Sequence, residues 1–258
     1  MESQVLTNIP KPVDPNGELM VKMRDVYKSF GDNDVLKGFN LDLMRGENLV
    51  VLGKSGSGKS VLIKCMVALL MPDKGEVEVF GKNIPKLNRD DLDEVRVKIG
   101  FLFQSSALYD SMTVRENLEF PLRRHWINKT RTEVDELVME ALDNVGLKDA
   151  IDLMPSELSG GMRKRIGLAR TLILKPDIIL YDEPTTGLDP ITSREISNLI
   201  LEIQNKYNTS SIIITHDMAC AKIVSNRVIV LVNGISHAEG TYDELNKTSD
   251  PEVKPFFE

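Results

Sequence analysis

The eight residues from Gly53 to Ser60 constrain this chain more than any other stretch, because GKSGSGKS fits the phosphate-binding pattern G-x-x-x-x-G-K-[ST]. The apolar run Glu47–Leu52 ahead of it predicts a strand, and Val61–Met71 behind it predicts a buried helix that ends before Pro72. Glycines let such a loop wrap closely around phosphates, with its N–H groups and the positive end of the next helix facing them. The lysine can reach the β- and γ-phosphates, and the serine hydroxyl can bind Mg²⁺. The residues expected to contact a nucleotide are therefore Gly53, Ser55, Gly56, Ser57, Gly58, Lys59 and Ser60.

A second apolar run ends in two acids. Residues Ile178–Tyr181 predict a strand that is followed by Asp182 and Glu183. An aspartate that an apolar strand brings beside a phosphate-binding loop is placed to hold Mg²⁺. The adjacent glutamate can orient the water that attacks the γ-phosphate or accept its proton. A solvated acidic pair at a turn is the alternative interpretation, and the phosphate-binding loop makes it the weaker one.

A third motif, Leu158–Met162 (LSGGM), opens a predicted helix that continues through Arg163–Leu174. Ser159 is a favourable N-cap, and the two glycines leave the N-terminus of the helix bare, which predicts a second anion site. A chain with one phosphate-binding loop does not need two such sites for one nucleotide. We therefore expect Ser159 and Gly161 to close on the nucleotide of another copy. An ordinary helix cap is the alternative.

Composition excludes several classes of protein. The chain has 258 residues, enough for one large domain or two small ones, and its net charge of −7 argues against nucleic acid as a partner. Two well-separated cysteines favour a reducing compartment over a disulfide framework, and no apolar run reaches the ~18 residues of a membrane span. The first residues carry no secretion signal. We expect a flexible extension over 1–18, one nucleotide-binding domain over 19–248, and a tail over 249–258.

The order of predicted elements indicates an α/β fold. Alternating apolar residues in Leu19–Val26 and Val35–Leu43 predict antiparallel strands, and Glu76–Phe80 predicts another. Farther along, strands and helices alternate, which predicts parallel strands with helical crossovers. These are the helices Asp90–Lys98, Val114–Leu122, Thr132–Val145, Ser193–Tyr207 and Met218–Val224, and the strands Ile99–Phe103, Ser211–Thr215 and Val228–Val232. The predicted fold is a P-loop NTPase core with a small N-terminal antiparallel β-subdomain and an α-helical subdomain inserted at about 104–158.

This series of motifs resembles the ATP-binding subunit of an ABC transporter, from about Met20 to Leu245. Gly53–Ser60 is similar to the family's Walker A motif, Ile178–Glu183 to its Walker B motif, and Leu158–Met162 to its signature motif. Met162 replaces the usual glutamine of the signature, and Lys54 replaces a commoner proline or asparagine in the loop. Four further residues match single family positions: Phe30 the aromatic residue that stacks on adenine, Gln104 the Q-loop glutamine, Asp189 the D-loop aspartate, and His216 the switch histidine.

The resemblance implies ATP and Mg²⁺ as cofactors and ATP hydrolysis by two copies arranged head-to-tail. It implies Glu183, His216 and Gln104 as catalytic residues, and Ser60, Gln104 and Asp182 as Mg²⁺ ligands. Asp189 is expected beside the nucleotide, and the surface around Gln104–Tyr109 against a membrane permease. For three of these residues a role outside the nucleotide site is the alternative: Gln104 as an exposed residue at a strand end, Phe30 as a core residue, and His216 as a structural histidine.

Three stretches resemble the ATPases of Mce-type lipid transporters, which include the Mla phospholipid system: Phe101–Leu108, Tyr109–Leu122 and Met154–Met162. This resemblance implies a multispanning permease, an Mce-domain protein and in some bacteria a STAS-domain protein as partners, with the chain on the cytoplasmic face of the inner membrane. One alternative is an ABC ATPase of a solute importer or of lipoprotein release. Others are a soluble ABC ATPase without a transport role and a nucleotide-sensing module without turnover.

Overall fold

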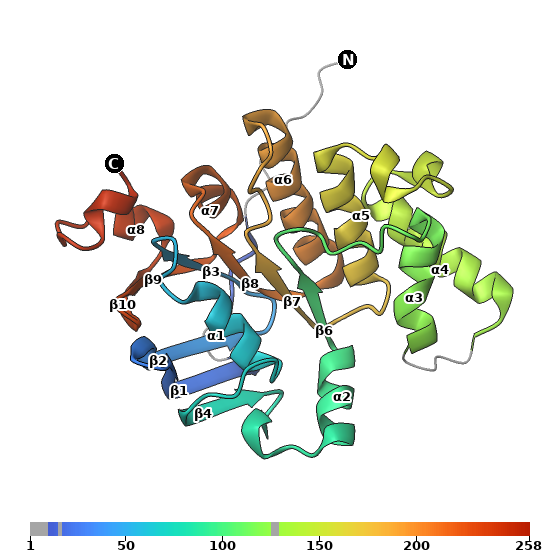
Figure 1. Ribbon diagram of the computed structural model, residues 1–258. Helices are drawn as coiled ribbons and strands as arrows, with labels where there is room; N and C mark the ends of the chain where they lie inside the picture. The colour runs from blue at the N-terminus through green and yellow to red at the C-terminus, as the bar shows by residue number, and fades with distance from the viewer. Residues whose placement is uncertain (1–9, 15–16, 125–128) are drawn as a thin grey trace.

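The computed structural model describes residues 10–14, 17–124 and 129–258 and contains two sheets (Figure 1). The central sheet has the strand order β10-β9-β3-β8-β7-β6, in which β9, β3, β8, β7 and β6 run parallel and β10 pairs antiparallel with β9. Its strands are β3 (Asn48–Gly53), β6 (Ile99–Leu102), β7 (Ile178–Asp182), β8 (Ser210–Thr215), β9 (Arg227–Val232) and β10 (Ile235–Gly240). The predicted parallel strands with helical crossovers are confirmed.

The smaller sheet is antiparallel, as predicted. Its order is β2-β1-β4-β5, and its strands are β1 (Leu19–Phe30), β2 (Asn33–Met44), β4 (Lys74–Val79) and β5 (Lys82–Asn83). Strands β1 and β2 are longer than the sequence pattern indicated, because pairing continues up to the tight turn between Phe30 and Asn33. Gly31 occupies this turn with a φ of 59°, a conformation that favours glycine.

The central sheet separates two hydrophobic cores, because successive side chains of a strand face opposite sides. On β3, Val50 and Leu52 join the core beneath α5, α6 and α7, whereas Leu49 and Val51 join the core shared with α1, α2 and the antiparallel sheet. All four side chains are fully buried. Burial on both faces explains why these strands are continuous apolar runs in the sequence.

Helices cover both faces of this sheet (Figure 1). They are α1 (Lys59–Met66), α2 (Arg89–Val97), α3 (Val114–Arg124), α4 (Arg131–Asn144), α5 (Gly160–Leu172), α6 (Pro190–Tyr207), α7 (Met218–Val224) and α8 (Tyr242–Asn246). Helices α3 and α4 lie between β6 and α5, where the helical subdomain was expected, and form a lobe at the right of Figure 1. No helix in the described ranges is long and apolar enough to cross a membrane.

The helix after the phosphate-binding loop is shorter than predicted: it ends at Met66, so the expected span Val61–Met71 is wrong at its C-terminal end. Ala68 adopts a φ of 50°, and the chain reverses so that the N–H groups of Leu69 and Leu70 bond to the Lys64 carbonyl. Leu69 and Met71 are consequently about half exposed instead of buried.

The C-terminal residues pack against the core. Val253 is fully buried, and the rings of Tyr242 and Phe257 lie 5.2 Å apart, edge to face. Strand β10 and helix α8 were not anticipated from the sequence. At the other end of the chain, the carbonyl of Lys11 accepts a hydrogen bond from Asn226 Nδ2. Most of the predicted flexible extension, residues 1–9 and 15–16, lies outside the described residues.

Candidate functional site

The carboxyl ends of four parallel strands bring the predicted residues together. The phosphate-binding loop follows β3, Asp182 ends β7 and Glu183 follows it, His216 follows β8, and Gln104 follows β6. In an open α/β sheet this edge is where ligands bind. A cavity of about 550 Å³ opens there, lined by Phe30, Val35, Ser55, Gly56, Ser57, Gly58, Lys59, Ser60, Val61, Gln104, Glu183 and His216.

The loop needs its glycines for conformation and for space. Gly56 and Gly58 have φ values of 77° and 100°, which disfavour other residues. A Cβ atom on Gly58 would lie 2.5 Å from Val35 Cγ1, and one on Gly53 would lie 2.5 Å from Ser57 Oγ. Gly58 is also the N-cap of α1 and offers no side-chain acceptor to that helix. The first N–H groups of α1 are therefore available to an anion.

Lys59 lies buried along the loop, with 6% of its surface exposed. Its Nζ donates to the carbonyls of Gly53 and Lys54 at 2.8 and 3.2 Å and lies 3.8 Å from Glu183 Oε1. Burial lowers the pKa of Lys59, and the nearby carboxylates of Glu183 and Asp182 act in the opposite direction. The ammonium group therefore sits between the loop and the acidic pair, where it can bind a phosphate.

Ser60 and Asp182 meet in a geometry that fits Mg²⁺. Ser60 Oγ donates to Asp182 Oδ1 at 3.0 Å, and the carboxylate is only 7% exposed. Burial raises the pKa of Asp182, so a cation beside it would favour the ionised form. Among the described residues there is no cluster of three or more histidine, cysteine or acidic ligands. Mg²⁺ is held through few protein oxygens together with water and substrate phosphates, and the Ser60 hydroxyl and the Asp182 carboxylate can supply such oxygens.

Glu183 and His216 form a direct pair. His216 Nδ1 lies 2.8 Å from Glu183 Oε2, and Thr186 Oγ1 donates to the same oxygen at 3.2 Å. The His216 side chain is 65% exposed, whereas the Glu183 side chain is 12% exposed. The imidazole therefore faces the cavity and orients a carboxylate that is mostly shielded from water. Such a pair can position a water molecule and accept its proton.

Gln104 and Phe30 both line the cavity. Gln104 is exposed in the loop after β6. Phe30 ends β1 and is 47% exposed, so the interpretation of Phe30 as a core residue is wrong. Lys28 Nζ lies 5.5 Å from the centroid of the Phe30 ring. The exposed part of this ring forms an aromatic surface at the rim of the cavity. An exposed aromatic ring at this position can stack on a base.

Three predicted binding residues lie apart from this cavity. Ser159 Oγ caps α5 by accepting the N–H of Met162 at 3.2 Å, so its predicted role as an N-cap is confirmed. Asp189 caps α6 through the N–H groups of Ile191 and Thr192. Neither residue, nor Gly161, is among the described residues that line the cavity. Within one chain, Ser159 and Asp189 act as helix caps.

Gly161 is also required by packing. A Cβ atom there would lie 2.6 Å from Thr192 Cγ2, and Thr192 is held in its rotamer by the hydrogen bond from its hydroxyl to Asp189. At Gly160 the nearest atom would be Leu188 Cδ2 at 3.6 Å, an ordinary contact. Gly160 can therefore be replaced by a residue with a Cβ atom, whereas at Gly161 a Cβ atom would displace Thr192.

We expect Gly161→Ala to lower the free energy of unfolding by about 1–3 kcal/mol, the usual result of overpacking. Gly160→Ala is the matched control and should change stability by less than about 1 kcal/mol. Thr192→Ser removes the clashing methyl group and keeps the hydroxyl, so the double variant Gly161→Ala/Thr192→Ser should recover most of the loss. Urea titration of the four proteins measures these differences. Equal stability of the two alanine variants would contradict the packing argument.

The motifs did not reveal Lys164. It lies in α5 with 5% of its surface exposed, and its Nζ donates to the main-chain carbonyls of Gln104 and Glu183. One signal was available: Gly167 and Leu168 follow at spacings of three and four, so Lys164 lies on the buried face of the helix. A lysine on that face needs buried acceptors.

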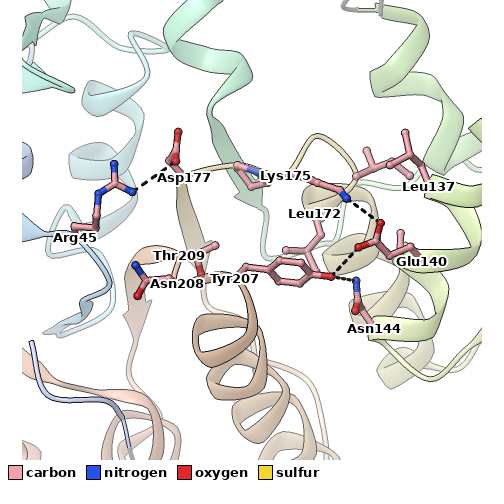
Figure 2. Close-up of a pocket in the computed structure, with 13 residues that line it drawn as sticks. Arg45, Leu137, Glu140, Asn144, Leu172, Lys175, Asp177, Tyr207, Asn208 and Thr209 are labelled. Carbon is pink, nitrogen blue, oxygen red and sulfur yellow. Dashed lines mark hydrogen bonds and ion pairs between the residues drawn. The ribbon is translucent and has the colours of Figure 1, made fainter. Parts of the chain in front are cut away.

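A second cavity, of about 160 Å³, lies between α4, the end of α5 and the end of α6 (Figure 2). Its polar rim is paired internally: Lys175 with Glu140, Glu140 with Tyr207, and Tyr207 with Asn144 (Figure 2). None of the motif residues lines it. These contacts join the helical lobe to the core on a side that the motifs do not use.

Comparison with known proteins agrees with this geometry. The family model described as ABC transporter matches residues 36–186, more than half of the chain. The chain belongs to the ABC transporter family. It is an ATP-binding subunit of that family and hydrolyses ATP. The match includes the phosphate-binding loop, Gln104, the signature motif and the acidic pair, and it ends before Asp189 and His216.

Two curated relatives match this chain over 92% of its length. The chain is 35% identical to the MlaF ATP-binding protein of the intermembrane phospholipid transport system of Haemophilus influenzae, over 92% of this chain and 89% of the relative. It is 39% identical to the probable ribonucleotide transport ATP-binding protein mkl of Mycobacterium leprae, over 92% of this chain and 68% of the relative. The names of these two relatives give different substrates, phospholipid and ribonucleotide.

A solved structure supports the fold of the cassette and its nucleotide chemistry. It is an ATP-binding cassette in a dimeric, post-hydrolysis state with ADP and inorganic phosphate bound. The TM-score is 0.79 at 33% identity, and the similarity covers 86% of this chain and 99% of that one. The predicted α/β P-loop core is therefore confirmed.

Proposed function

We propose that two copies of this chain form a head-to-tail dimer that drives a membrane permease and moves phospholipid or another lipid between membranes. The observation that carries the nucleotide part is the single cavity where Lys59, Glu183, His216 and Gln104 meet. The lipid part is supported by 35% identity to the MlaF protein over nearly the full length of both chains.

Each residue at the cavity has a separate role in binding or hydrolysing ATP. Lys59 and the N–H groups of the loop bind the phosphates, and Phe30 stacks on the adenine. Ser60 and Asp182, with Gln104, are the residues that would hold Mg²⁺, which supplies charge neutralisation at the phosphate oxygens. Glu183 holds the attacking water and takes its proton. His216 fixes the carboxylate at 2.8 Å and contacts the γ-phosphate. Rate enhancement comes from positioning and electrostatics.

Two features support a site shared between two copies. A hollow of about 720 Å³ adjoins His216 and is lined in part by Thr186, Leu188 and Ile191. Ile191 is 75% exposed and lies beside Leu188 in the wall of this hollow, which gives the hollow an apolar surface that a second copy could cover. The N-terminus of α5, which Ser159 caps, is not among the described residues that line the cavity at the phosphate-binding loop of its own chain. In a head-to-tail dimer, Ser159, Gly161 and Asp189 would reach the nucleotide of the partner subunit.

The proposed setting is the cytoplasmic face of the inner membrane, where the chain is held by a multispanning permease. The surface around Gln104–Tyr109 is the proposed contact with it, because it includes the exposed Tyr109 and leads directly to the catalytic cavity. An Mce-domain protein, and in some bacteria a STAS-domain protein, would complete a system of the Mla type. A ribonucleotide transporter is the second candidate, because the name of the mycobacterial relative gives that substrate.

Transport by the reconstituted complex tests the substrate. The chain would be purified in complex with its membrane permease and placed in liposomes that contain labelled phospholipid, with labelled ribonucleotide outside. We expect ATP-dependent movement of phospholipid and no uptake of ribonucleotide. A complex that carries Glu183→Gln is the matched control and should move neither. ATP-dependent uptake of ribonucleotide without movement of lipid would overturn the lipid assignment and leave the ATPase assignment intact.

A further inference from the structure

Lys164 is a buried lysine at the meeting point of three functional segments. It lies in α5, the helix that begins at the signature motif, and Asp182 and Glu183 are close enough to act on its charge. Burial lowers the pKa of Lys164, and the two carboxylates oppose that effect. Retaining a lysine in such a place requires hydrogen-bond acceptors for its ammonium group.

The acceptors are main-chain carbonyls of two site residues. Lys164 Nζ donates to the Gln104 carbonyl at 2.5 Å and to the Glu183 carbonyl at 3.2 Å. Gln104 follows β6 and Glu183 follows β7, so one side chain of α5 ties together the ends of two neighbouring strands. A shift of α5 would therefore act on both residues at once.

The backbone of Glu183 needs such support. Its φ of 51° lies in the left-handed region, which a residue with a side chain keeps only where its surroundings hold it. Its N–H group donates to the Ile214 carbonyl of β8 at 2.9 Å, and its carbonyl accepts from Lys164 Nζ at 3.2 Å and from the Thr186 N–H group at 3.3 Å. Both polar groups of this peptide backbone are thereby fixed. Because the backbone of Glu183 is fixed by these hydrogen bonds, the direction of its carboxylate is set as well.

Arg170 provides a comparison on the same helix. Its guanidinium donates to the carbonyls of Ala107 and Ser106 at 2.8 and 3.0 Å, so it holds the loop after Gln104. It has no bond to Glu183 among the contacts of the described residues. Lys164 therefore differs from Arg170 in its hydrogen bond to the Glu183 carbonyl. Substituting each residue alone can distinguish the effect of that bond from the effect of holding the loop.

We propose that Lys164 is a positioning residue that sets the catalytic carboxylate and the Gln104 loop relative to the signature helix. The proposal rests on the assignment of Glu183 as the catalytic carboxylate. Lys164 lies outside the residues that line the nucleotide cavity, so it acts on the rate of hydrolysis and leaves the binding of ATP unchanged. Through α5 it also links the helix end that faces the partner's nucleotide to the hydrolytic group of its own chain.

The test compares Lys164→Met with Lys164→Gln in the complex with the permease. Methionine keeps the length and loses the donor, so we expect kcat to fall about 10- to 100-fold, the range for a small misplacement of a catalytic group. The affinity for ATP and the KM should stay within about twofold. Glutamine keeps N–H donors for the two carbonyls and should restore most of the rate. Counting the ATP retained by each variant in a Glu183→Gln background corrects kcat for any loss of folded protein.

Two further variants make the result specific. Arg165→Met, one residue along, removes contacts with Val145 and Glu195 and should leave kcat unchanged. Arg170→Met loosens the loop alone and should lower kcat less than Lys164→Met. An unchanged kcat in Lys164→Met, a parallel loss of ATP affinity, or an equal loss in Arg170→Met would overturn the proposal. If Glu183→Gln itself still hydrolysed ATP, the assignment of the catalytic carboxylate would fail instead.

Discussion

Glu183→Gln should leave ATP binding intact and lower hydrolysis by about 10²- to 10⁴-fold, the contribution of a general base. The amide has the size of the carboxylate and can still contact His216 and Thr186, which lie 2.8 and 3.2 Å from Oε2. It cannot accept a proton from the attacking water. Because ATP binds and is not consumed, the dimer should accumulate in its closed form.

Phosphate release by the purified complex measures this effect, and equilibrium titration with labelled ATP measures the affinity. Glu202→Gln is the matched control, because Glu202 is an exposed carboxylate of α6 outside the residues that line the cavity. That variant should hydrolyse ATP at the wild-type rate. If Glu183→Gln retained turnover within a few fold of the wild type, another group would have to take the proton.

The sequence predicted the catalytic edge well, because the motifs sit at the ends of apolar runs. Parallel strands that are buried on both faces are recognisable as such runs, and their carboxyl ends meet at one edge. Asp182 was predicted there because it ends such a run, whereas His216 and Gln104 were predicted there because they match single positions of the ABC family. The same reasoning placed the helical lobe between Gln104 and Leu158.

Three features of the structure were not predicted, because no pattern of side chains in the sequence indicates them. Strand β10 alternates between half-buried and exposed residues at the edge of the sheet, and its sequence ISHAEG contains no apolar run that would predict a strand. The early end of α1 depends on the left-handed backbone of Ala68, a residue that ordinarily favours helix. The acceptors of Lys164 are main-chain carbonyls, which every residue carries. No residue type could indicate them.

The second large effect concerns the sharing of sites between two copies. Lys59→Ala removes the phosphate-binding ammonium group, and Ser159→Arg adds bulk that should keep two subunits from closing over ATP at that point. In a head-to-tail dimer, placing one lesion in each subunit puts both lesions in the same composite site. Placing both lesions in one subunit puts one lesion in each site. The two arrangements contain the same substitutions and differ only in their distribution.

The decisive measurement is the amount of ATP retained per mixed dimer, with hydrolysis blocked by Glu183→Gln in both subunits and the subunits distinguished by two affinity tags. The shared arrangement predicts one ATP per dimer when the lesions are split between the subunits and none when one subunit carries both. Sites built within single chains predict the reverse. If Ser159 only caps a helix, both arrangements should retain one ATP. Equal retention in the two arrangements, or the reverse order, would contradict the head-to-tail dimer.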